Sequence, residues 1–269
     1  IEPESFNDIS QNFVQDQLAA AGTLHAILLT SLVSFLIVGI IEEVSKFWAL
    51  RHSAGTLFVS IDDVMQLGII VAIGFSFAEN IVNPVYFTSF VQDYLLHGSV
   101  PDVAGFLSNV LGRSVLTGMV HIVSTGVLSY FFGVALFAGT QFRSENGAKA
   151  PVFIRTLHSL LRLPEESIFR THMIVTGLFF AVVLHALFNF VVTMPDILPG
   201  HPRSLHDLFG SMSPRFLSGI PILLFSSLLY VVGGFWLLTN LFMKKDNMVR
   251  RGHLILRESY VQEIVDDED

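Results

Sequence analysis

Long apolar runs alternate with short polar stretches along the whole chain. Five of these apolar runs are long enough to be candidate transmembrane helices: residues 18–41, 64–84, 114–142, 171–195 and 216–243. Four of them contain no Asp, Glu, Lys or Arg, and 64–84 is interrupted only by Glu79. A helix needs about 20 mostly apolar residues to cross the hydrocarbon core of a bilayer. The pattern therefore predicts an all-α membrane protein, a polytopic bundle of about five transmembrane helices, with a re-entrant or interfacial segment as a further apolar element in 85–112.

The first run continues beyond its charged residues. After Glu42, Glu43 and Lys46 the chain reads Phe-Trp-Ala-Leu before Arg51. We therefore expect these three charges to lie inside the first transmembrane helix rather than at its end.

The composition is typical of a membrane protein and excludes several classes of function. Hydrophobic residues make up 52% and charged residues only 14% of the chain, whereas soluble domains carry about 25% charged residues. The net charge of −8 opposes binding to the phosphates of nucleic acid, so the lipid bilayer is the expected partner and nucleic acid is not. The chain has no Cys, which excludes disulfides, thiolate metal sites and a cysteine nucleophile.

Lys and Arg are distributed unevenly between the loops, which predicts the orientation. The loop 143–170 and the tail after residue 243 hold five each, whereas the stretch before residue 18 and the loop 85–104 hold none. We expect the N-terminus outside and the C-terminus in the cytoplasm. The expected parts are an acidic extracytoplasmic segment (1–17), a transmembrane domain that carries the site (18–245) and an acidic cytoplasmic tail (246–269).

Ionisable residues within the spans are the most informative ones. An ionised side chain at the bilayer centre costs roughly 2.5–3.5 kcal/mol even on insertion scales. The residues concerned are Glu42, Glu43, Lys46, Glu79 and Arg113. They must face one another or a water-filled cavity, either as ion pairs that fix helix packing or as a functional site. Glu42 and Lys46 are four apart, so they share a helical face and can pair. Glu43 lies about 100° round the helix, so one of the two acids can be paired with Lys46 while the other stays free.

Two later runs carry polar stripes at helical spacing. The residues recur at every fourth position: Arg113, Thr117, His121 and Thr125 in one run, and His185, Asn189 and Thr193 in the other. Asn80 stands beside Glu79. Four helices would thus present carboxylates, imidazoles and a carboxamide in one layer.

This set of groups is able to hydrolyse a peptide bond. A carboxylate held away from bulk water beside a second one can take a proton from water. A neutral His and an Asn amide can donate hydrogen bonds to the oxyanion, and Lys46 can keep one Glu ionised. The sequence contains no His-Glu-x-x-His, Gly-x-Gly-Asp or Gly-x-Ser-x-Gly motif. A zinc site built from Glu42, Glu79, His121 and His185 stays chemically open.

Four short motifs resemble those of the PrsW family of membrane proteases, which is related to the CAAX-prenyl endopeptidases. Glu42-Glu43-Val-Ser-Lys46 is similar to Glu-Glu-x-x-Lys, and Phe75-Ser-Phe-Ala-Glu79-Asn80 to Phe-x-x-x-Glu-Asn. His121 and His185-Ala-Leu-Phe-Asn189 resemble the two later His motifs. The order matches over about residues 40–195, with one motif on each of four expected helices.

The resemblance implies a function and a role for each residue. Glu42 would be the water-activating base, helped by Glu79. His185 and Asn189 would hold the oxyanion, and His121 would line the site. The implied enzyme is a glutamic-type, metal-independent intramembrane protease of the bacterial inner membrane, with no cofactor, although zinc is possible. Its substrate would be a single-pass membrane protein such as an anti-sigma factor.

Two other functions fit part of the same pattern. A proton- or ion-coupled transporter would also bury Glu, His and Lys, but it usually shows inverted repeats, and the sequence has none. A non-catalytic relative that only binds membrane helices would not need every catalytic position to be filled.

Overall fold

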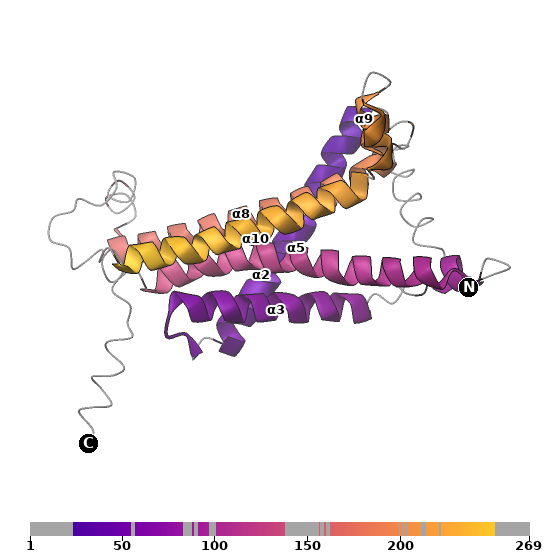
Figure 1. The fold of residues 1–269 in the computed structure, drawn as a ribbon. Helices are drawn as coiled ribbons and strands as arrows, with labels where there is room; N and C mark the ends of the chain where they lie inside the picture. The colour runs from indigo at the N-terminus through magenta and orange to yellow at the C-terminus, as the bar shows by residue number, and fades with distance from the viewer. Residues whose placement is uncertain are drawn as a thin grey trace. The chain divides into compact units, whose positions relative to one another are not determined.

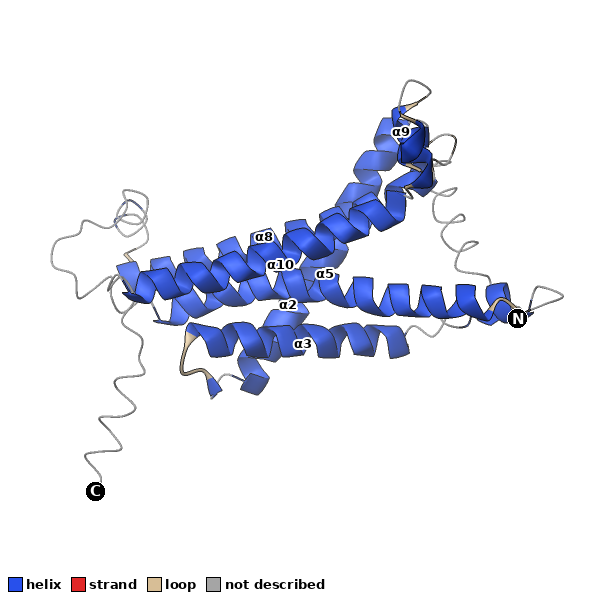
Figure 2. Ribbon diagram, in the orientation of Figure 1, coloured by secondary structure: helices blue, strands red, loops and turns tan. Residues whose placement is uncertain are grey.

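The structure is a computed structural model that describes most of the apolar part of the chain. The described residues are 24–54, 57–82, 91–96, 101–137, 162–198, 204–210, 214–220 and 222–250, with single positions at 88, 156, 159, 200 and 202. The expected N-terminal segment 1–17 lies outside them, as does the part of the C-terminal tail after residue 250. Within the described residues every helix or strand element is a helix (Figure 2).

Five long helices follow one another along the chain (Figure 1). They are α2 (Leu24–Ala54), α3 (Ile61–Val82), α5 (Val103–Phe137), α8 (Glu165–Ile197) and α10 (Ile222–Arg250). Each contains a stretch that is long and apolar enough to cross a membrane, so the predicted five spans are confirmed and the chain is a multi-pass membrane protein. The short elements are a π-helix, η2 (Val91–Leu96), the single-turn helix α9 (Leu205–Phe209) and a 3₁₀ helix, η3 (Arg215–Gly219).

Two helix boundaries bear on the sequence prediction. Helix α2 runs without interruption through Glu42, Glu43 and Lys46, as the apolar residues beyond them predict. Helix α5 begins at Val103 rather than at residue 114, and residues 102–137 contain no proline that would interrupt it. The expected re-entrant segment 85–112 therefore contains the π-helix η2 and the start of α5, and, apart from Thr88, Pro101 and Asp102, its other residues lie outside the described part.

Local hydrogen bonds explain how polar residues are accommodated at helix ends and within helices. Asp63 accepts hydrogen bonds from the backbone N–H of Ser60 (2.8 Å) and Val59 (3.1 Å), while the Asp63 N–H donates to the Ser60 hydroxyl (3.2 Å). This reciprocal cap satisfies backbone donors at the start of α3. Within the long helices, hydroxyls donate to the carbonyl one turn earlier, as Thr30 does to Ala26 and Ser129 to Thr125, both at 2.7 Å.

The described chain divides into two compact units, and each long helix contributes residues to both. The first unit comprises Ile1–Gly39, Ile73–His121 and Val183–Gly234, and the second comprises Ile40–Ala72, Ile122–Val182 and Phe235–Asp269. In the second unit a cluster of buried apolar side chains forms the core: Leu50, Ile61, Val64, Met65, Tyr130, Phe132, Val134 and Phe137. In the first unit Ile27 packs against Ile197.

Helix α5 is the most buried of the five. In its membrane-spanning window 83% of the residues are buried, against 17–33% in the other four. Glycines let neighbouring helices approach it closely within the second unit, as small residues do in membrane bundles. A Cβ on Gly68 of α3 would overlap the Ser129 Oγ, and a Cβ on Gly177 of α8 would lie 2.7 Å from the Phe131 Cβ.

We expect Gly68→Ala to destabilise the protein by about 1–3 kcal/mol, the usual cost of overpacking. The new methyl group would also meet the Ser129 Cβ at 2.8 Å, and that atom cannot rotate away. The measurement is the free energy of unfolding in detergent. The control is Gly74→Ala on the same helix, where a Cβ would meet nothing within 4 Å; it should be neutral or stabilising by up to about 1 kcal/mol. Equal effects of the two variants would contradict the close packing at Gly68.

Candidate active site

A buried ion pair lies in the second unit, within helix α2. The Lys46 Nζ is 2.7 Å from the Glu43 Oε1, and both side chains are completely buried. The two residues are three positions apart, a spacing that brings side chains together on one helical face. The helix therefore carries a buried cation together with its own counter-ion.

Two hydroxyls of helix α5 complete the surroundings of Glu43. The Ser124 Oγ donates to the Glu43 Oε1 at 2.9 Å, and the Thr125 Oγ1 donates to the Oε2 at 3.1 Å. Both residues are fully buried. Glu43 thus accepts hydrogen bonds from one ammonium and two hydroxyl groups, which is how a buried carboxylate is stabilised. Sequence reasoning placed Thr125 in a polar stripe but missed Ser124, whose only signal is its position next to Thr125.

Glu42 has different surroundings from its neighbour. Its side chain is 19% exposed, and its Oε2 lies 3.5 Å from the Lys46 Nζ. The spacing predicted a pair between Glu42 and Lys46; the contact exists, but Glu43 is the closer partner of Lys46. Glu43 also accepts hydrogen bonds from the Ser124 and Thr125 hydroxyls of α5. These bonds hold the Glu43 carboxylate within reach of the Lys46 ammonium. Glu42 has the more accessible side chain of the two.

In the first unit, helix α3 contacts helix α5 through Glu79 and His121. The Glu79 Oε2 is 3.0 Å from the His121 Nε2. His121 is buried, whereas the Glu79 side chain is 29% exposed. Sequence reasoning placed these residues in one layer of the bundle, but it could not show that they contact each other.

Two aromatic contacts hold the ring of His121 in this unit. His121 packs edge to face against His185 of α8, with ring centroids 5.1 Å apart. The Phe75 ring lies on another side, with its centroid 5.5 Å away. Phe75 is one turn before Glu79 on α3, so a single helix face supplies both an apolar and a charged contact to His121.

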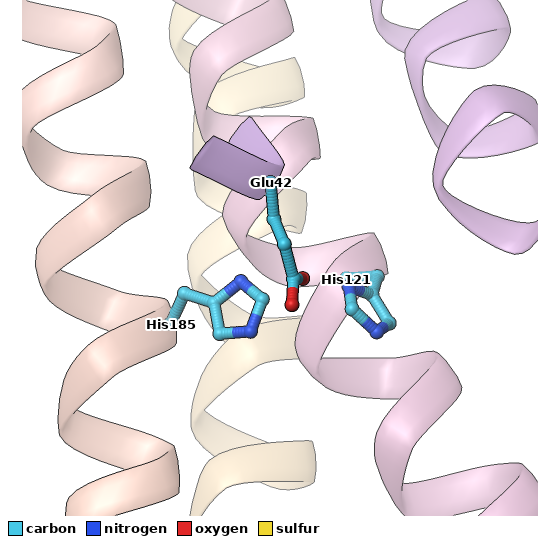
Figure 3. A group of neighbouring side chains, drawn as sticks. All are labelled: Glu42, His121 and His185. Atoms are coloured by element: carbon cyan, nitrogen blue, oxygen red, sulfur yellow. The ribbon is translucent and has the colours of Figure 1, made fainter. Parts of the chain in front are cut away.

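Among the described residues, Glu42, His121 and His185 form a candidate group of metal ligands. Figure 3 shows the three side chains. One carboxylate and two imidazoles form a donor set used by catalytic zinc sites, and they also form a set of proton-transfer groups. The chemistry of these donors therefore fits either a bound zinc ion or a metal-free hydrolytic site.

The structure describes fewer contacts for the other predicted site residues. Asn189 is half-buried on α8, four residues after His185, and its backbone carbonyl accepts a hydrogen bond from the Thr193 hydroxyl at 2.8 Å. Asn80 is half-buried beside Glu79 on α3. Arg113 lies in α5, but its side chain is outside the described part of the structure.

Comparison with known proteins identifies the family. A search of curated proteins and a search of solved structures each found no match. A family model described as PrsW family intramembrane metalloprotease matches residues 9–206, a range that includes α2, α3, α5 and α8 with all four motifs. The match covers well over half of the 269 residues. The chain therefore belongs to the PrsW family.

Proposed function

We propose that this membrane protease hydrolyses a peptide bond in or near the transmembrane segment of a membrane-anchored protein, with Glu42 as the group that activates water. Membership of the PrsW family supports intramembrane proteolysis. It also favours a protease over the ion-coupled transporter that buried Glu, His and Lys residues would otherwise allow.

The observation that carries the proposal is that the carboxylate of Glu42 and the imidazoles of His121 and His185 form a candidate ligand group. Such groups can accept a proton from water and return it to a leaving group. Glu42 suits this role because its side chain is partly accessible, whereas Glu43 is enclosed by Lys46, Ser124 and Thr125.

The proposed reaction uses one water molecule and no covalent intermediate. Glu42 takes a proton from the water as its oxygen attacks the scissile carbonyl carbon. His185 and Asn189, one helical turn apart on α8, donate hydrogen bonds to the oxyanion. The C–N bond then breaks, and the Glu42 carboxyl returns its proton to the leaving amine. The products are a carboxylate and an amine.

A bound zinc ion is the main alternative for the same residues. Glu42, His121 and His185 would hold it, and zinc there would polarise the carbonyl and activate water. We favour the metal-free mechanism, in which Glu42 itself takes the proton from water. The matching family model is described as a metalloprotease, so removal of metal ions is the experiment that separates the two mechanisms.

We expect activity to survive removal of metal ions. The purified enzyme in detergent would be treated with EDTA or 1,10-phenanthroline, dialysed, and assayed with and without added zinc. A loss of activity that zinc restores would show that the site is a metal site. The control is the thermal midpoint before and after treatment, which separates loss of a metal from unfolding.

We further propose that the substrate is a single-pass membrane protein such as an anti-sigma factor, cleaved in the bacterial inner membrane. The excess of Lys and Arg in loop 143–170 and after residue 243 supports an outside N-terminus and a cytoplasmic C-terminus. The test compares new protein N-termini in membranes that contain the wild type or Glu42→Gln. New termini beside transmembrane segments that occur only with the wild type would support the proposal, and identical patterns would contradict it.

A further inference from the structure

The contact between Glu79 and His121 specifies more than helix packing. The Glu79 Oε2 lies 3.0 Å from the His121 Nε2. An ionised carboxylate can only accept hydrogen bonds, so the ring nitrogen that faces it must carry the hydrogen. The contact thus selects which nitrogen of His121 is protonated.

The surroundings of His121 hold this arrangement in place. The ring is buried, and it packs against His185 on one side and Phe75 on another. A ring flip would exchange Nε2 with Cε1 and so remove the hydrogen bond to the Glu79 carboxylate. In neutral imidazole only one nitrogen carries a hydrogen, and the partner of that nitrogen determines the tautomer.

We propose that Glu79 is a positioning residue that accepts the Nε2–H of His121 and thereby presents Nδ1, with its lone pair, as the acceptor nitrogen of the ring. Glu79 then acts on the site through His121 and does not itself exchange a proton with water. His121 packs against His185, so Glu79 acts on this pair of imidazoles through His121. Partners of this kind orient the imidazoles of metal sites, where their loss typically costs 10–100-fold in metal affinity or activity, and we expect a loss of similar size here.

This role differs from direct help in activating water, and one pair of substitutions separates the two. Glu79→Gln keeps an amide oxygen that can accept the Nε2–H but removes a base. Glu79→Leu removes both. A positioning role predicts that Gln largely preserves function and Leu does not, whereas a proton-transfer role predicts that both variants fail.

The primary test is the tautomeric state of His121, read by ¹⁵N NMR of ring-labelled histidine in the full chain in detergent micelles. The His121 signals would be assigned by their absence in His121→Gln. We expect the Nε2–H tautomer in the wild type and in Glu79→Gln, and its loss in Glu79→Leu. The control is Ser76→Ala, a buried residue on the same helix, which should leave the signals unchanged.

The second readout is kinetic and rests on the proposed function. Glu79→Leu should lower kcat by about 10–100-fold with KM unchanged, and Glu79→Gln should recover most of that loss. A wild-type His121 in the Nδ1–H or doubly protonated form would overturn the proposal, as would an unchanged tautomer in Glu79→Leu. If Glu79→Leu does not fold, equal loss of kcat in Glu79→Gln and Glu42→Gln would overturn it. The NMR result does not depend on proteolysis, so failure of the proposed function would be recognised separately.

Discussion

Glu42→Gln is expected to lower kcat by about two to four orders of magnitude, the range that a general base contributes. The amide has nearly the same shape as the carboxylate but cannot take a proton from water. Because the Glu42 side chain is 19% exposed and Glu43 is the closer partner of Lys46, the fold should be preserved. The measurement is cleavage of the identified substrate by purified enzyme, with the thermal midpoint recorded on the same sample.

The adjacent glutamate provides a matched control. Glu43→Gln is the same chemical change one residue later, in a side chain that is fully buried against Lys46, Ser124 and Thr125. We expect it to lower stability, because it leaves a buried ammonium without its closest charge partner. Activity that survives in Glu42→Gln but is lost in Glu43→Gln at temperatures where both are folded would show that the two roles are reversed.

Lys46→Met should cause the largest loss of stability, about 3–5 kcal/mol, which is typical when one member of a buried ion pair is removed. The methionine fills a similar volume, so the loss would come from the charge on Glu43 rather than from a cavity. The Ser124 and Thr125 hydroxyls would remain, but neither carries a positive charge. The measurement is the free energy of unfolding in mixed detergent micelles.

A double variant tests this explanation. Lys46→Met combined with Glu43→Gln has no buried charge at either position, and the Gln oxygen can still accept a hydrogen bond from a hydroxyl. We expect it to be more stable than Lys46→Met alone. If the free energy of unfolding falls in the double variant by at least the sum of its decreases in the two single variants, the buried pair does not account for the stability.

The apolar runs were sufficient to predict the five spanning helices. Helix α2 continues through Glu42, Glu43 and Lys46 because Phe47, Trp48 and Leu50 follow them, and that pattern can be read locally. The start of α5 at Val103 could not be read in the same way, because residues before 114 include Arg113 and no long uncharged run. A charge does not stop a helix; it only interrupts the hydropathy signal.

The candidate site was predicted as a set of residues, but not as a set of contacts. Local spacing shows that Lys46 can reach either Glu42 or Glu43. The choice depends on Ser124 and Thr125, about 80 residues later in the chain. The contact between Glu79 and His121 likewise spans 42 positions. Such pairings depend on how helices rotate against one another, and a single sequence does not contain that information.

The buried ion pair of α2 also has a consequence for how the protein is made. Ser124 follows Glu43 by 81 residues, so at a synthesis rate of about 5–20 residues per second its hydroxyl emerges roughly 4–16 s later. During that interval α2 has to enter the bilayer without the partners that α5 will supply. Because Lys46 and Glu43 lie on the same helix, they can neutralise each other from the outset. Helix α2 can therefore be inserted with its Lys46–Glu43 ion pair already formed, before α5 enters the membrane.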